Sequence, residues 1–113
     1  IAQSGTKGTM IMCIPNDGSI DGLRNDDVVE ITCDVDKNGC TPHRIGKADE
    51  QNLELIRRVK NYERLSSKAI RERSRSAAIQ ALTLHPLVNS YSIAVKLVDE
   101  FIEHNKNYCG GWK

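Results

Sequence analysis

Residues 28–33, with the sequence VVEITC, determine how the first half of the chain folds. Apolar and polar side chains alternate in this stretch, so Val29, Ile31 and Cys33 share one face of a strand, and the glutamate and threonine between them share the other. This period of two predicts a strand with one face on a core and the other face in solvent.

A hairpin turn is predicted immediately after this strand. Asn38-Gly39 supplies two residues that tolerate the positive φ of a type I′ turn, so residues 28–37 should fold back upon a shorter strand that begins near Cys40. Pro42 has no backbone N–H to donate, which makes this shorter strand an edge of the sheet.

A further strand is predicted upstream, at residues 9–14 with the sequence TMIMCI. A continuous apolar run of this length indicates a buried strand. The sequence PNDG at residues 15–18 then ends it, because proline and glycine suit a turn.

The period changes after Asp49, where apolar residues recur every three or four positions. This spacing predicts one long amphipathic helix, which should end around residues 71–76. The apolar positions of this helix are Leu53, Ile56, Val59, Tyr62, Leu65 and Ala69.

Two shorter helices complete the predicted fold. Serines within residues 71–76 can cap a second helix that Pro86 ends, and Ser90 can cap a third helix. Gly110-Gly111 is predicted to end the ordered chain. The pattern as a whole predicts an α+β fold, with a small antiparallel sheet followed by two or three helices.

Composition excludes several classes of function. A chain of 113 residues fits one compact domain, and its formal net charge of +1 attracts neither nucleic acid nor an acidic membrane. No apolar run is long enough to span a bilayer, and no signal peptide pattern opens the chain. We therefore predict a soluble, cytoplasmic protein whose four cysteines are reduced thiols. Because Ile1 replaces an initiator methionine, we expect a segment of a longer gene product.

The residues that could form a chemical site do not combine into one. Cys40 and His43 are metal-ligand types, but zinc needs three or four ligands and no second pair completes the set. Asp26-Asp27 and Asp99-Glu100 are adjacent pairs whose side chains point in different directions, unlike a glycosidase dyad. His85 and His104 lie near predicted helix ends without a nucleophile.

A basic stretch in the long helix suggests a surface for nucleic acid at first sight. Glutamates interrupt it, and pairs such as Glu54 with Arg58, or Lys68 with Glu72, have the spacing of ion pairs on one helix face. A solvated helix face is therefore favoured. Neither a Gly-x-Gly-x-x-Gly motif nor a phosphate loop is present in the sequence.

Four stretches resemble glycoside hydrolase family four, in the order in which that family has them. The hairpin sequence at residues 27–39 is similar to the family's V-E-V-P-C hairpin, and RVKNYER at residues 58–64 resembles its V-K-x-Y/F-E helix. ALTLHPLV at residues 81–88 resembles its A-L-x-x-x-P-L-V segment, and residues 90–103 match its closing helix. The Pro86-Leu87-Val88 sequence is more similar to the 6-phospho-β-glucosidases than to the α-specific members.

The resemblance implies a domain like the C-terminal domain of lactate dehydrogenase relatives, at the end of an unusual glycosidase. NAD in such an enzyme oxidises the sugar transiently at C3, a tyrosine-type base removes the C2 proton, and the aglycone leaves by elimination. A divalent metal, commonly manganese, is held by a cysteine and a histidine and polarises the carbonyl.

The same resemblance places those groups upstream of the matched region. We therefore expect no catalytic, cofactor-binding or metal-binding residue in this chain, and Cys33, Cys40 and His43 do not match the family's ligand motif. Asn16 could approach the pocket of an intact enzyme, but a role in a turn is favoured because asparagine forms Asx turns.

The resemblance thus predicts that residues 1–113 are a C-terminal domain for substrate binding and oligomerisation, lacking the dinucleotide-binding domain and inactive alone. The parent would be a homo-oligomer that hydrolyses phosphorylated β-glucosides such as cellobiose 6-phosphate, and the domain would show an apolar surface when separated from it. Two alternatives remain at this point: the same domain of a hydroxy-acid dehydrogenase, and a helical interaction module that acts alone.

Overall fold

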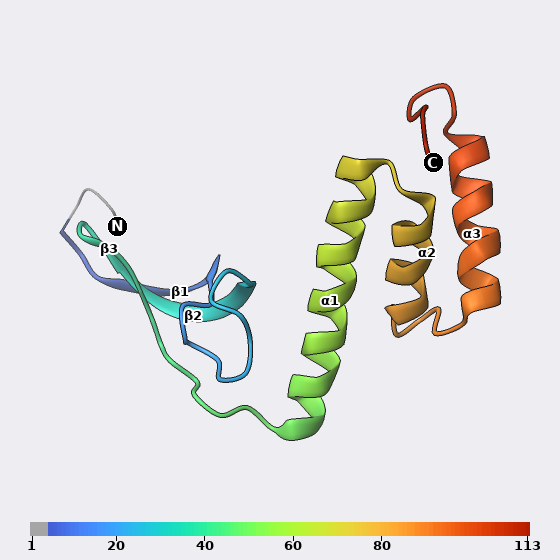
Figure 1. Cartoon of the computed structure of the whole chain (residues 1–113). Coiled ribbons are helices and arrows are strands. Elements are labelled where there is room, and N and C mark those ends of the chain that lie inside the picture. Colours follow the sequence, from blue (N-terminus) through green and yellow to red (C-terminus); the bar gives the residue numbers. More distant parts are fainter. Residues whose placement is uncertain (1–4) are drawn as a thin grey trace. The chain divides into compact units, whose positions relative to one another are not determined.

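The structure is a computed structural model that describes residues 5–113. Residues 1–4, which include the Ile1 start, lie outside the described part. The elements in chain order are β1 (Gly8–Pro15), β2 (Val28–Asp36), β3 (Gly39–Pro42), α1 (Glu50–Glu72), α2 (Arg75–Leu84) and α3 (Tyr91–His104), labelled in Figure 1. The predicted α+β fold is confirmed, with three helices after the sheet.

The chain divides into two compact units, although its length alone predicts one domain. The sheet unit ends at Leu53, and the helical unit comprises Glu54–Lys113. The division therefore falls within α1, whose first turn belongs to the sheet unit.

The sheet is antiparallel, and β2 is its central strand, between β1 and β3. The predicted alternation along β2 is confirmed, because Val29, Ile31 and Cys33 are buried while Glu30 is exposed. Ile20 completes this core, and apolar side chains from the surrounding segments pack against it. These are Met12, Ile14, Leu23, Val35, Ala48 and Leu53.

The hairpin between β2 and β3 forms, but its turn lies one residue earlier than predicted. Asp36 pairs with Gly39, so Lys37 and Asn38 are the loop residues, and Gly39 alone of this group has a positive φ, of 127°. The Asp36 carboxylate accepts a hydrogen bond from the Asn38 backbone N–H at 2.7 Å. This Asx interaction closes the turn without the two positive φ angles of a type I′ turn, which corrects the prediction.

The strand predicted at residues 9–14 is present as β1, but it is not buried on both faces. Met12 and Ile14 pack on the core, whereas Ile11 is 66% exposed and Cys13 is exposed. The predicted position of Pro42 at an edge is confirmed, since within residues 5–113 β3 pairs with β2 alone.

Helices α2 and α3 begin directly after serines that cap them, as predicted. The Ser74 hydroxyl accepts from the Ala77 backbone N–H at 3.3 Å, and the Ser90 hydroxyl accepts from that of Ile93 at 3.4 Å. Helices α2 and α3 lie side by side (Figure 1) around a small core of Ile79, Ala94 and Val98.

The order of the chain does not end at Gly110-Gly111, contrary to the prediction. The Lys113 backbone N–H donates to the Arg73 carbonyl, and the Arg75 backbone N–H donates to the Lys113 carbonyl, both at 2.8 Å. These two hydrogen bonds hold the C-terminal residues against the connection between α1 and α2.

Each helix of the described chain is too short or too polar to cross a lipid bilayer.

Candidate functional site

The loop after β1 is built around the buried side chain of Asn16. Its Nδ2 donates to the Ile20 carbonyl at 3.1 Å, and its Oδ1 accepts from the Ile20 backbone N–H at 2.8 Å. The two residues that follow, Asp17 and Gly18, both have positive φ. Both ends of the Asn16 amide are thus engaged inside the loop, which supports the favoured role as a turn former.

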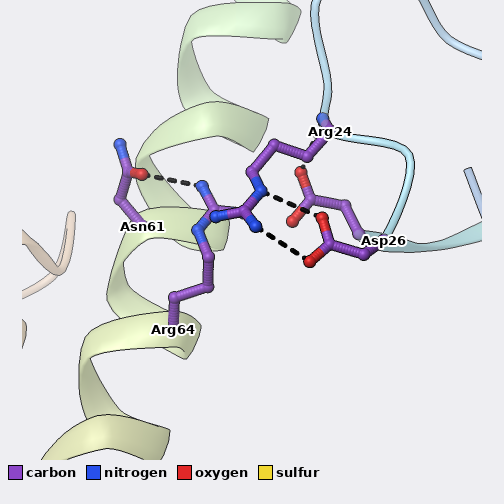
Figure 2. A network of polar contacts seen from close by, with 5 residues as sticks. Arg24, Asp26, Asn61 and Arg64 are labelled. Atoms are coloured by element: carbon purple, nitrogen blue, oxygen red, sulfur yellow. Dashed lines mark hydrogen bonds and ion pairs between the residues drawn. The ribbon is translucent and has the colours of Figure 1, made fainter.

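Asp26 and Asp27 occupy different environments and do not form a catalytic pair. Asp27 is buried, and its Oδ2 accepts from the Arg24 backbone N–H at 3.0 Å. Asp26 is exposed and forms a two-bond ion pair with the Arg24 guanidinium, at 2.9 Å for each bond (Figure 2). Both carboxylates therefore fasten the loop.

The sheet gathers one polar cluster that the sequence did not indicate, around Asp34. Its carboxylate accepts from Lys7 at 2.8 Å, from the Thr9 hydroxyl at 2.9 Å and from His43 Nε2 at 3.0 Å. The bond from Lys7, followed by those from Thr9 and His43, holds the pKa of Asp34 well below its usual range. Asp34 is therefore ionised at neutral pH and cannot serve as a general acid.

The register of β1 on β2 explains why the sequence alone did not predict this cluster. Thr9 lies opposite Asp34 across the sheet, and His43 follows β3. Asp34 and its partners thus come from three separate segments. The cluster has a sequence signal, a carboxylate opposite a threonine, only once the register of β1 on β2 is known.

The residues Cys40 and His43 do not come together as metal ligands. His43 contacts Asp34, whereas the Cys40 thiol is exposed and lies beside that of Cys33. Burial, with the Cys40 thiol as a second cause, raises the pKa of Cys33 to about 11, so this thiol remains protonated. Residues 5–113 contain no group of three His, Cys, Asp or Glu side chains that could hold a metal. These side chains do not fit a manganese site.

In the helical unit, Arg58 and Tyr62 of α1 fasten the end of α2. The Arg58 Nε donates to the Leu84 carbonyl at 3.1 Å, and its Nη2 donates to Asn89. The Tyr62 ring meets the His85 ring edge-on, with 4.6 Å between the centroids. His85 Nδ1 also lies 3.2 Å from the Leu87 backbone N–H, from which it accepts. His85 is thus a structural residue at the helix end.

Several charged side chains of the helices are engaged with neighbours. Arg75 at the start of α2 bonds both carboxylate oxygens of Asp99 on α3, at 2.6 and 2.8 Å, and this guanidinium lowers the pKa of Asp99. Lys60 pairs with Glu63 at 2.8 Å. Arg64 donates to Asn61 at 2.7 Å (Figure 2). Such partners agree with a solvated helix face, but the expected partner of Glu54 is engaged elsewhere, because the Arg58 guanidinium donates to Leu84 and Asn89.

An apolar groove of about 230 Å³ lies between the three helices. Tyr62, Ser66 and Ile70 of α1 form one wall of it. The other wall comes from α2 and α3, and comprises Ala78, Ala81, Leu82, Val98, Phe101 and Ile102. Its lining has hydroxyls but no ionisable carboxylate or imidazole, so it suits contact with apolar groups.

Residues 2–88 match the sequence profile of the family 4 glycosyl hydrolase C-terminal domain. The chain belongs to this family. The polar side chains of this family 4 domain described above mainly fasten loops and helix ends.

Relatives of this family 4 domain are phosphoglucosidases of both anomeric types. The chain is 36% identical over 103 residues to the maltose-6′-phosphate glucosidase MalH of Clostridium acetobutylicum, covering 91% of this chain and 23% of the relative. It is 40% identical over 93 residues to the 6-phospho-beta-glucosidase BglT of Thermotoga maritima, covering 82% and 22%. The chain therefore spans less than a quarter of the length of these relatives.

The fold is also similar to solved structures of the family. The 6-phospho-beta glucosidase of Thermotoga maritima, solved with manganese, NAD+ and glucose-6-phosphate, has a TM-score of 0.84 and 35% identity. The match covers 96% of this chain and 28% of that one.

Proposed function

We propose that the chain is the C-terminal part of an NAD- and divalent-metal-dependent 6-phospho-β-glucosidase, with cellobiose 6-phosphate as a representative substrate. The 40% identity with BglT carries this proposal. The manganese, NAD+ and glucose-6-phosphate bound in the similar Thermotoga structure support the cofactors and the phosphorylated sugar. In this proposal residues 1–113 are a substrate and oligomerisation domain, and a dinucleotide-binding domain precedes them in the parent.

The chain alone would be inactive under this proposal. Asp34 and Asp99 are bound by cationic partners, and His85 is committed to Tyr62 and Leu87. Acid–base catalysis needs groups whose pKa lies near the working pH and which reach the substrate, and these side chains do not meet that need. The redox and metal chemistry would be supplied by NAD and manganese bound to other parts of the parent.

A 6-phospho-α-glucosidase is the second candidate. The match to MalH covers more of this chain than the match to BglT, 91% against 82%, although its identity is lower, 36% against 40%. Both candidates share the phosphorylated glucose unit in their names and differ in the anomer that is cleaved.

The test is hydrolysis of chromogenic 6-phospho-β- and 6-phospho-α-glucosides by the full-length parent and by this chain. The proposal expects turnover of the β-substrate by the parent alone, lost when NAD is omitted or when manganese is chelated. Turnover of the α-substrate alone would favour the second candidate. Activity of the isolated chain, or a parent that acts on neither substrate, would contradict the proposal.

The proposal includes a homo-oligomeric parent in the cytoplasm. The helical unit exposes large apolar side chains such as Leu87 and Phe101, which favours contact with another surface. All four cysteines are free thiols, as expected in a reducing compartment. Light scattering of the parent would contradict the oligomer if it gave the mass of one chain.

A further inference from the structure

Strand β1 presents apolar side chains on the face that the core of the sheet unit leaves open. Ile11 lies opposite Thr32 and Cys13 lies opposite Glu30, while Met12 between them packs on the core. Side chains alternate between the faces of a strand, so Ile11 and Cys13 share the outer face. Both are exposed.

The outer edge of β1 lacks the protection that the opposite edge of the sheet has. Strand β3 has four residues and ends with Pro42, which are features that block pairing with another strand. Strand β1 has eight residues, carries no charged side chain, and has no proline before Pro15. Within the described chain it pairs with β2 alone.

The sequence of β1 is that of a strand covered on both faces. A strand with one solvent face alternates between apolar and polar residues, as β2 does, whereas residues 9–14 form a nearly continuous apolar run. Ile11 and Cys13 thus occupy positions at which a solvent-facing strand carries polar residues. This mismatch indicates that another layer covers the outer face of β1.

We propose that the outer face and edge of β1 bind the part of the parent enzyme that precedes this chain. This inference rests on the proposed function. More than three quarters of the length of the relatives lies outside the matched region. In the proposed parent, the segment that precedes this chain is joined to it covalently. A covalent connection raises the effective concentration of that segment at β1, an advantage that a second copy does not have.

Thiol labelling of the full-length parent tests whether the face is covered. Cys13 on β1 and Cys40 on β3 are both exposed, but Cys13 lies on the outer face and Cys40 lies opposite Val35 on the face of Cys33. Cys40 therefore reports the labelling rate of an exposed thiol away from the proposed contact. N-ethylmaleimide labelling, followed peptide by peptide with mass spectrometry, should modify Cys13 at least about tenfold more slowly than Cys40, because a covered thiol reacts only after local opening. Equal rates would overturn the inference.

Cross-linking from Cys13 in the parent identifies the segment that covers it. A thiol-attached photo-cross-linker should join Cys13 to peptides that precede residue 1 of this chain. Cross-links mainly to residues 54–113, or to the second copy in a mixture of isotope-labelled and unlabelled protein, would overturn the proposed occupant.

A pair of substitutions measures the apolar contact itself. Ile11→Lys should lower the melting temperature of the parent, while Ile45→Lys, at an exposed isoleucine outside the sheet, should leave it unchanged. Equal effects of the two would contradict the inference. An active phosphoglucosidase with a rapidly labelled Cys13 would refute this inference alone, and a protected Cys13 in an inactive parent would refute the proposed function alone.

Discussion

The two units of the chain bury different kinds of side chain. The sheet unit buries branched aliphatic residues, namely Ile20, Val29 and Ile31, together with the polar Asn16 and Asp27. The helical unit buries four alanines besides Ile79 and Val98, and exposes large apolar groups such as Phe101. Alanine allows close approach of helices but removes little apolar area from water. The comparison indicates that the stability of the helical unit depends more than that of the sheet unit on apolar contacts with surfaces outside the unit.

The distribution of aromatic residues makes the comparison measurable. The tyrosines, the phenylalanine and the tryptophan all lie in the helical unit, and the sheet unit ending at Leu53 has none. Trp112 fluorescence therefore reports on the helical unit. The thiol of Cys33, which is fully buried, reports on the opening of the sheet unit through its rate of labelling.

The largest effect is expected from Ile31→Ala in the core of the sheet unit. Ile31 is 4% exposed, and its truncation should lower the free energy of unfolding by about 2–5 kcal/mol, because it loses apolar burial and leaves a cavity. Labelling of Cys33 across a urea series measures this loss. The exposed Ile45→Ala serves as control, with a change within about 0.5 kcal/mol. Equal results for the two variants would show that this core is not tightly packed.

Asn16→Ala should have the next largest effect, because it removes both bonds to Ile20 inside a buried loop. The unfolding free energy should fall by about 1–3 kcal/mol for the polar groups left without partners. The matched control is Asn38→Ala in the exposed hairpin loop, where the backbone N–H that bonds Asp36 is kept. A neutral Asn16→Ala would mean that the loop does not depend on this side chain.

Ala94→Leu tests whether the alanines set the spacing of α2 and α3. Ala94 is fully buried in the cluster with Ile79 and Val98, so the larger side chain should destabilise the helical unit by about 1–3 kcal/mol. Urea unfolding followed by Trp112 fluorescence measures the effect, with the exposed Ile93→Leu as control. Stabilisation by Ala94→Leu would reveal unfilled space and would sharpen the contrast with the sheet unit.

The smallest effect is expected from Asp34→Asn, and it should depend on pH. The pKa of Asp34 is lowered from its ordinary value of 3.8 in the folded chain, so the unfolded chain binds a proton first as the pH falls. The stabilisation by Asp34 is thus present above about pH 5 and is lost as the pH falls below about 4.

Urea midpoints of wild type and Asp34→Asn between pH 7 and pH 2.5 measure this dependence. The two curves should differ at neutral pH and converge in acid, and Thr9→Ala should remove part of the difference because it deletes one donor to Asp34. Curves that stay parallel at every pH would contradict the role of the Asp34 network.

The sequence predicted the surroundings of some candidate site residues and missed those of others. The Asn16 amide is hydrogen-bonded inside its loop, which agrees with its expected role in a turn. His43 contacts Asp34 and not Cys40, which agrees with the interpretation that these two residues are neighbours in sequence without being metal ligands. The Asp34 cluster and the Arg75–Asp99 pair were not predicted, because each joins segments that are distant in sequence. Their partners follow from strand register and helix packing, which periodicity does not specify.

The sequence by itself determined the identity and order of the elements. The alternation in β2, the capping serines Ser74 and Ser90, and the edge position of Pro42 all depend on neighbours a few residues away, so local patterns suffice.

Tertiary structure decided the features in which distant residues compete. The pairing of Asp36 with Gly39 placed the hairpin turn one residue earlier, at Lys37 and Asn38, where the Asn38 N–H donates to the Asp36 carboxylate. Lys113 joined the connection between α1 and α2 through hydrogen bonds to Arg73 and Arg75. The exposure of Ile11 likewise depends on which layers pack on β1. The physical reason is that the free energy that selects these features comes from contacts that exist only after the chain has folded.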